Sequence, residues 1–299
     1  MISPLWATVS PIRRQAAKLI SDYNQPLLPS SFGLGLSLPK SSFRASFECR
    51  CTNKEIQDKP AEGFSVLASD IPWDTGSIWS TMAIYMFNLH IPLGYGGLSI
   101  VTYILHQSIL KPETEALSLL ILQILELAGA PFLLGAAKPN CAFVSFNANK
   151  SAKERNWLLA SALGFGSIIS LVFLTSILSD NIVGTKAVNN PVVKEILMSS
   201  LTSRTACVLV YCFIAPVLEE TVYRWFLLTS LASTMDWRHA VLISSAIFSA
   251  SHFSGENFLP LFIIGCVLGC SYSWTGKLRT PVLIHSLYNA FALLMTFLS

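Results

Sequence analysis

The sequence has little charge for its length. Only 12% of its 299 residues are Asp, Glu, Lys or Arg, whereas 52% are hydrophobic, and soluble domains carry about 25% charged residues. The formal net charge of +3 is small, so nothing in the charge balance points to a nucleic-acid partner. Long uncharged runs instead predict an all-α, polytopic transmembrane helical bundle of about seven to eight membrane helices, with the lipid bilayer as its surroundings.

The cysteines do not form the pattern of a disulfide framework. There are seven of them, an odd number, and most lie scattered through apolar segments. Cys266 and Cys270 are four residues apart and share a helix face, but two thiols alone do not make a zinc site. We therefore expect the cysteines to be reduced and buried.

Acidic residues are scarce at the N-terminus, where Asp22 and Glu48 are the only ones before Cys51. The same stretch is rich in Ser and Arg, a composition typical of an organelle transit peptide, and it lacks the single apolar core of a secretory signal. We expect residues 1–55 to be a transit peptide and residues 56–74 to be a polar linker. Ser and Pro outweigh any helical Arg pattern, which favours a chloroplast membrane, thylakoid or envelope, over a mitochondrial one. A disordered cytosolic tail is the alternative.

Apolar segments long enough to cross a bilayer, about 20 residues each, follow this leader. We expect front membrane helices over residues 75–204 and motif-bearing helices over residues 205–299. The front part has an uncharged run at 75–110, interrupted near Pro92 and the glycines at 94–97, and a polar stretch at 179–204 closes it. The expected spans are 75–110, 116–137, 157–178, 205–231, 239–253, 258–274 and 281–298.

Two adjacent carboxylates and an arginine interrupt the fourth of these spans. Ionised side chains are costly in hydrocarbon, so they usually face a cavity and serve a function. On a helix Glu220 and Arg224 are at i and i+4 and can pair, which a purely structural salt bridge also explains. Glu219 points about 100° away and is left free to act. Pro216 cannot donate a backbone hydrogen bond to Cys212 and is expected to open the turn before Glu219.

Two later helices carry further polar signatures. Phe248 and His252 form one i,i+4 pair, and His285 and Asn289 form another, so each pair shares a helix face. Each residue alone has an ordinary interpretation as a bundle histidine or an interhelical amide. Together with Glu219 they supply a base, two imidazoles and an amide donor, a set suited to activating water against a carbonyl.

Other polar residues in apolar segments receive no assigned role from the sequence. These are Glu126, His90, His106 and His239.

The ordered motifs Glu-Glu-x-x-x-Arg, Phe-x-x-x-His and His-x-x-x-Asn resemble those of the CPBP family, which includes the type II CAAX prenyl endopeptidases. The resemblance covers about residues 205–297. It implies that Glu219 activates the attacking water, with Glu220 and Arg224 as a supporting ion pair. It further implies that His252 helps to hold the water, and that His285 and Asn289 line the oxyanion side.

Two positions depart from the family pattern. Trp225 stands where Gly is common, and Tyr223 stands where Phe is usual. A Trp at this place forbids a close helix approach and so affects the packing around Arg224. The family is generally described as not needing zinc, and no cofactor is expected. A zinc enzyme stays open as an alternative because Glu and His are acceptable zinc ligands, although the sequence has no His-Glu-x-x-His motif.

The leading hypothesis is an intramembrane, glutamate-dependent endopeptidase resembling CAAX prenyl proteases, with a polypeptide substrate. The alternative is a non-catalytic membrane adaptor or scaffold on the same fold, which would bind a membrane-protein partner. A transporter is disfavoured because the polar residues cluster in one half of the chain. Prenylated substrates fit a plastid address poorly, so the substrate itself stays open.

Overall fold

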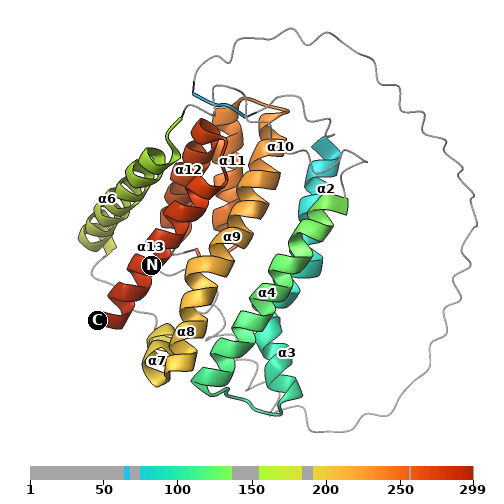
Figure 1. The fold of residues 1–299 in the computed structure, drawn as a ribbon, viewed down its shortest axis with the longest axis vertical. Coiled ribbons are helices and arrows are strands. Elements are labelled where there is room, and N and C mark those ends of the chain that lie inside the picture. Colours follow the sequence, from blue (N-terminus) through green and yellow to red (C-terminus); the bar gives the residue numbers. More distant parts are fainter. Residues whose placement is uncertain (1–63, 68–74, 137–154, 184–190, 256, 299) are drawn as a thin grey trace, which may run out of the picture.

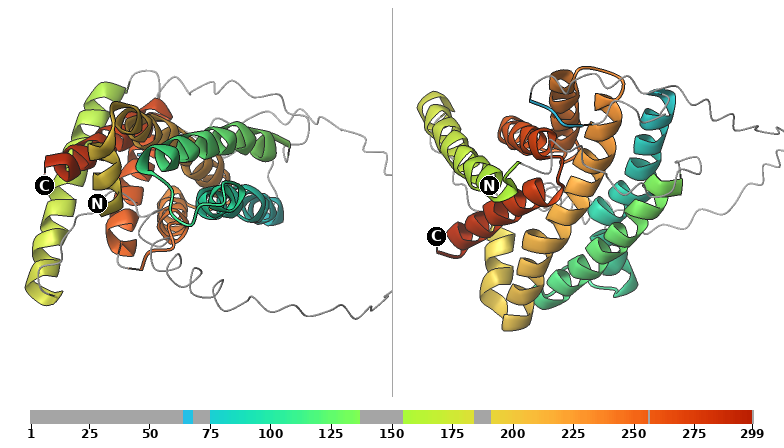
Figure 2. Two further views of the ribbon diagram at one scale, coloured as in Figure 1. Left: turned by 90° about the horizontal axis from the view of Figure 1, so that it is seen from below. Right: turned by 45° about the horizontal axis from the view of Figure 1, so that its top comes forward.

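The computed structural model describes residues 64–67, 75–136, 155–183, 191–255 and 257–298. The expected transit peptide at 1–55 and most of the expected linker at 56–74 lie outside the described residues. Within the described ranges every regular element is a helix, which confirms the all-α prediction. The helices run side by side as a bundle in all three views (Figures 1 and 2).

The front of the bundle consists of α2 (Thr75–Tyr85), the π-helix η1 (Met86–Tyr95), α3 (Gly97–Ile104) and α4 (Pro112–Ala136). The helix α6 (Trp157–Val183) and the short α7 (Pro191–Ser199) follow. A long helix then comprises α8 (Leu201–Leu209), the π-helix η2 (Val210–Ile214), α9 (Ala215–Glu220), the π-helix η3 (Thr221–Leu228) and α10 (Thr229–Ala232). The chain ends with α11 (Trp237–Ala250), α12 (Phe258–Thr275) and α13 (Arg279–Leu298).

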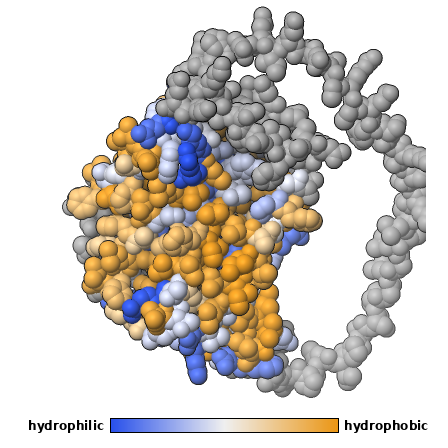
Figure 3. Space-filling model, in the orientation of Figure 1, coloured by the Kyte–Doolittle hydropathy of each residue, from blue (hydrophilic) through white to orange (hydrophobic). Residues whose placement is uncertain are grey.

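Five helices in the described part of the chain are long and apolar enough to cross a membrane. They are Pro112–Gly135, Trp157–Thr175, Leu201–Ala232, Phe258–Thr275 and Arg279–Leu298. The face shown in Figure 3 carries a broad apolar band between hydrophilic patches at the top and bottom of the described part. These observations establish a polytopic helical membrane bundle. The count of seven to eight crossings stays a prediction, because neither the interrupted segment at 75–104 nor α11 is among these five.

The front segment bends where the sequence predicted an interruption. Pro92 lies inside η1, and Gly96 separates η1 from α3. A Cβ at Gly96 would stand only 2.9 Å from the carbonyl oxygen of Pro92, so the tight bend requires a glycine at this place.

The long central helix does not break at Pro216. It widens instead into the π-helix η2, which ends just before Ala215, so that Pro216 occupies the first turn of α9. Proline is tolerated there because its missing N–H lies at the start of the helical segment. A second π-helix, η3, begins at Thr221, directly after the two glutamates. Both glutamates therefore lie on a short α-helical turn between two wider ones.

The polar stretch at 179–204, which the sequence analysis treated as a connection, contains a helix. In α7 the side chains of Val193, Ile196 and Leu197 are buried, and this helix packs against α4, α8 and α13. The spacing of these apolar residues was the signal for it. Ser200 then ends the connection, because its hydroxyl accepts a hydrogen bond from the backbone N–H of Ser203 and caps α8.

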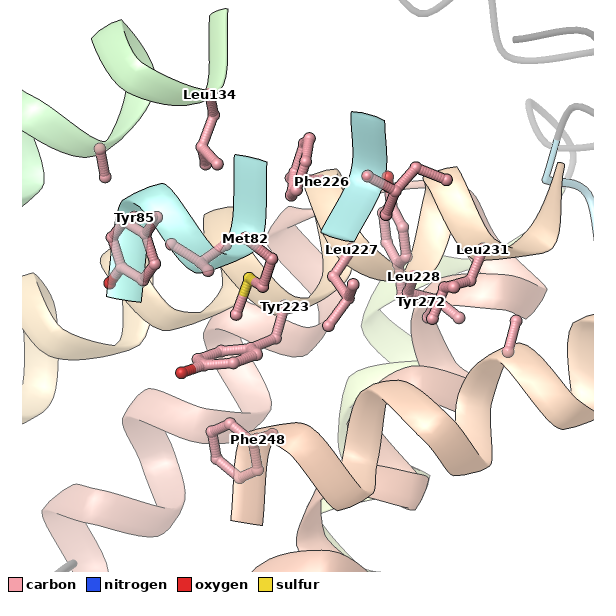
Figure 4. Close-up of a cluster of buried hydrophobic side chains, with 14 of the residues drawn as sticks. Met82, Tyr85, Leu134, Tyr223, Phe226, Leu227, Leu228, Leu231, Phe248 and Tyr272 are labelled. Carbon is pink, nitrogen blue, oxygen red and sulfur yellow. The ribbon is translucent and has the colours of Figure 1, made fainter. Parts of the chain in front are cut away.

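The long central helix lies between two groups of helices. On one side α6 packs against α12 and α13, and on the other α2 and η1 pack against α4 (Figure 1). A core of buried aromatic and aliphatic side chains joins the groups; Tyr85, Tyr223 and Phe248 lie in it close together (Figure 4). The cysteines in the described ranges, Cys207, Cys212, Cys266 and Cys270, are free thiols.

Candidate active site

The two adjacent glutamates of α9 have different surroundings. Glu220 is fully buried, with 0% of its side chain exposed, whereas 13% of the Glu219 side chain is exposed. Successive residues on a helix point about 100° apart, so one carboxylate is enclosed by protein while the other reaches a cavity. The two carboxylates thus differ in their surroundings, and the roles assigned to them from the sequence stay predictions.

Glu220 is held by two donors. Its Oε1 lies 3.0 Å from Arg224 Nη1 and 2.9 Å from His285 Nδ1, so the predicted i,i+4 ion pair is present. Arg224 is itself enclosed: Nη2 donates to the carbonyl of Gly265 at 3.3 Å, and the guanidinium lies 4.4 Å from the centroid of the Phe248 ring. The ion pair thus ties α9 and η3 to α12 and α13.

Glu219 faces two imidazoles. Its Oε2 lies 3.7 Å from His285 Nε2 and 3.9 Å from His252 Nε2. The same Oε2 is buried and has no hydrogen-bond partner among the described residues. Glu219, His252 and His285, from three separate segments of the chain, therefore meet at one point.

The tautomers of both rings follow from their other contacts. His252 Nδ1 lies 2.7 Å from the carbonyl oxygen of Phe248, and His285 Nδ1 lies 2.9 Å from Glu220 Oε1. Carbonyl and carboxylate oxygens only accept hydrogen bonds, so each Nδ1 carries a proton. In the neutral rings both Nε2 atoms then offer a lone pair toward Glu219.

Phe248 packs against both imidazoles. Its ring centroid is 4.9 Å from that of His252 and 6.2 Å from that of His285, in edge-to-face arrangements. Only 1% of Phe248 is exposed. The Phe-x-x-x-His motif therefore supplies both a ring at the site and the carbonyl that orients the histidine.

Asn289 is placed differently from the other predicted residues. Its Nδ2 donates to the carbonyl oxygen of Tyr211 at 2.8 Å, within η2. This bond joins α13 to the widened turn before α9, four residues from His285. Its predicted position on the oxyanion side stays a prediction.

A small cavity adjoins Glu219. The volume open to the centre of a water molecule is about 10 Å³, roughly the room that one water needs. Its lining residues are His90, Tyr95, Glu219, Tyr223, Ser251 and His252. Tyr223 donates to Ser251 Oγ at 2.7 Å, and Tyr95 donates to the Ser251 carbonyl at 2.7 Å. Tyr223, one of the departures from the family pattern, thus uses its hydroxyl in the cavity wall.

The sequence did not assign four of the lining residues to the site: His90, Tyr95, Tyr223 and Ser251. His90 and Tyr95 come from η1 in the front half of the chain. His90 contacts Glu126 of α4, which lies 36 residues further along the sequence. A lone acid and a lone histidine in apolar spans were visible signals, but nothing in the sequence indicates that two such distant residues meet. Trp225, the other departure, lies partly buried against the core cluster around Tyr223.

Within the described ranges, no group of three or more His, Cys, Asp or Glu side chains is arranged to hold a metal ion.

The fold and the site together define a helical membrane protein with a buried Glu-Glu-Arg group against two imidazoles. Residues 201–291 match the family described as "Type II CAAX prenyl endopeptidase Rce1-like". This segment carries all six residues that the sequence analysis named: Glu219, Glu220, Arg224, His252, His285 and Asn289.

Three curated proteins match this chain, among them the following two. The "Membrane-embedded CAAX protease MroQ" of Staphylococcus aureus (strain USA300) is 27% identical over 146 residues, which cover 46% of this chain and 57% of that protein. An "Uncharacterized 24.3 kDa protein" of Escherichia coli is 34% identical over 77 residues, which cover 24% of this chain and 36% of that protein. The match thus spans little more than half the length of the first relative. No solved structure gives a significant match.

Proposed function

We propose that this chain is a membrane endopeptidase of the CAAX protease type, in which Glu219 activates water for peptide-bond hydrolysis. The observation that carries the proposal is the meeting of Glu219 Oε2 with His252 Nε2 and His285 Nε2 at 3.9 and 3.7 Å. A water molecule at this point can donate its two protons to Glu219 and to one of the imidazoles. The family match over residues 201–291 supports it.

The reaction follows from these positions. The water oxygen attacks the scissile carbonyl carbon while Glu219 accepts the water proton. A carboxylate away from bulk water is a stronger base than one in solution. Glu220 and Arg224 act behind the site: Glu220 accepts from His285 Nδ1, which keeps the lone pair of His285 Nε2 on the side of Glu219. We assign Asn289 to holding α13 against η2.

The substrate class in this proposal is a polypeptide at a membrane. One relative is named as a CAAX protease, and a peptide with an S-prenyl cysteine near its C-terminus is the corresponding candidate. The leader composition at residues 1–55 further supports a chloroplast membrane, thylakoid or envelope, as the location. Imaging of residues 1–60 fused to a fluorescent protein tests the location, and a diffuse cytosolic signal would rule it out.

The decisive experiment compares full-length wild type with Glu219→Gln. Glu195→Gln serves as the matched control, because Glu195 is exposed on α7. New N-termini of membrane proteins are identified in cells that express each variant, and an S-farnesyl peptide is incubated with each purified protein. We expect fragments that appear with wild type and Glu195→Gln but not with Glu219→Gln. Equal fragments in all three, from well-folded protein, would show that the cleavage does not depend on Glu219 and would overturn the proposed mechanism.

A further inference from the structure

A second buried glutamate–histidine pair reaches the same cavity from the front helices. His90 Nδ1 lies 2.7 Å from Glu126 Oε1. Glu126 is 0% exposed and His90 is 9% exposed. Both residues lie outside the segment 201–291 that matches the family, and His90 lines the cavity together with Glu219 and His252.

The contacts of Glu126 indicate an ionised carboxylate. Its Oε1 also accepts from the Tyr85 hydroxyl at 2.8 Å, and its Oε2 accepts from Gln123 Nε2 at 3.3 Å. A carboxylate surrounded by donors in apolar helices needs a compensating cation. Among the described side chains that contact Glu126, His90 is the one that can carry a positive charge. We therefore treat His90 as an imidazolium paired with Glu126.

This pair contrasts with Glu220 and His285. Both histidines place Nδ1 on a buried carboxylate, at 2.7 and 2.9 Å. The charge of Glu220 is already balanced by Arg224, so His285 is free to be neutral and to accept hydrogen bonds. Glu126 contacts no arginine among the residues the structure describes. Of the two histidines, His90 is therefore the one that is charged and carries a proton on Nε2 to donate.

The His90 ring is fixed on several sides. It stacks on Tyr85 with ring centroids 5.7 Å apart, meets the edge of Tyr95 at 5.7 Å, and interacts with the backbone of Ser251. Nδ1 faces Glu126, so the other ring proton is the one on Nε2, on the side of the Ser251 backbone, and both His90 and Ser251 line the cavity. The titratable neighbours of His90 are Tyr85, Tyr95, Glu126, Glu219 and His252.

We infer that His90 is a further catalytic residue of the proposed peptidase, the acid that protonates the leaving amine, and that Glu126 and Tyr85 are its positioning residues. The inference rests on the proposed function. Water adds to the carbonyl carbon and gives one proton to Glu219. The C–N bond then breaks as the amide nitrogen takes the Nε2 proton of His90, and His90 regains a proton from Glu219 through water. The products are one carboxylic acid and one amine, so atoms and charges balance.

An ester substrate separates this role from a structural one. An alcohol leaves with far less need of protonation than an amine, so removing the acid should spare ester hydrolysis. The first probe is a synthetic peptide that contains a site cut by wild type but not by Glu219→Gln. The second probe is the same peptide with an ester in place of the scissile amide bond. For His90→Gln we expect amide hydrolysis to fall about 100- to 1,000-fold and ester hydrolysis to fall less than about 10-fold.

The controls distinguish the two proposals. Glu219→Gln should lose both activities, and His239→Gln, at an exposed histidine of α11, should change neither. If no Glu219-dependent peptide exists, the proposed function fails and the acid role with it. If Glu219→Gln is inactive but His90→Gln loses amide and ester hydrolysis equally while folded, the inference alone is wrong.

A milder variant guards against misfolding of His90→Gln. Tyr85→Phe removes one hydroxyl from Glu126 and leaves the ring in the core, so the protein should fold. It should lower the ratio of amide to ester hydrolysis by a few-fold. If the ratio of amide to ester hydrolysis is unchanged in Tyr85→Phe, Tyr85 has no positioning role. If the ratio is also unchanged in Glu126→Gln, the whole inference is wrong.

Discussion

Oε1 of Glu220 lies 2.9 Å from Nδ1 of His285, although 65 residues separate them in the sequence. The same carboxylate oxygen receives Arg224, so one buried atom links α9, η3 and α13. The orientation of His285, and through it the surroundings of Glu219, depends on this link.

Glu220→Gln should be strongly destabilising because it leaves the Arg224 guanidinium buried without its carboxylate. Breaking one partner of a buried ion pair costs about 3–5 kcal/mol. The double variant Glu220→Gln/Arg224→Met should be less destabilised than Glu220→Gln alone. Thermal unfolding of the purified variants in detergent measures both. A double variant whose loss is the sum of the two single losses would contradict the direct pairing.

Gly265→Ala should push α11 and α12 apart. The new Cβ would stand 2.9 Å from Ser245 Cβ and 3.1 Å from Ser245 Cα, and overpacking of this kind costs about 1–3 kcal/mol. The shift should also weaken the bond from Arg224 to the Gly265 carbonyl. Gly166→Ala, in α6, is the matched control, since no described atom outside its own helix backbone lies within 4 Å of the new Cβ. A melting temperature equal to that of Gly166→Ala would show that the helices can separate at little cost.

Asn289→Leu should lower stability, because it removes the donor for the Tyr211 carbonyl in η2. The net contribution of one such hydrogen bond to stability is about 0.5–1.5 kcal/mol. If Asn289 only joins the helices, Glu219-dependent cleavage per folded molecule should change less than about 10-fold. A larger loss of kcat in protein that melts normally would place its amide at the developing oxyanion, as the family resemblance implies.

Arg155→Gln should loosen the segment at residues 64–67. Arg155 Nη1 donates at 2.6 Å to the carbonyls of both Phe64 and Trp274, and Phe64 stacks on Trp237 at 4.8 Å. A hydrogen bond from a charged donor contributes about 1.5–3 kcal/mol, and Arg155→Gln weakens or removes two of them. Limited proteolysis should cut near this segment faster than in wild type, with Glu219-dependent cleavage unchanged. Equal cutting rates would show that other contacts hold it.

The sequence was most informative where both residues of a contact lie on one helix. Glu220 and Arg224 are four residues apart on one helix, so their pairing could be predicted without knowledge of the fold. The convergence of Glu219 with His252 and His285 required three helices to meet, and the resemblance to a family supplied that expectation.

Long-range contacts explain what was missed. The bond between His90 and Glu126 joins two apolar helices, and neither sequence neighbourhood shows a motif. The π-helices η2 and η3 were also invisible, because the residue pattern that widens a turn is weak. In the central helix the sequence predicted an irregularity near Pro216, which took the form of a wider turn instead of a break.

The end of α11 has a consequence for how such proteins diverge. The carbonyl of Phe248 accepts from both His252 Nδ1 and Ser251 Oγ, so these side chains close a helix terminus inside an apolar bundle. A related protein without catalytic activity would still need Ser251 and His252 in order to fold. The presence of these two residues in a homologue is therefore weak evidence that the homologue is catalytic. Glu219 Oε2 makes no such hydrogen bond among the described residues, so a pseudoenzyme would lose Glu219 first.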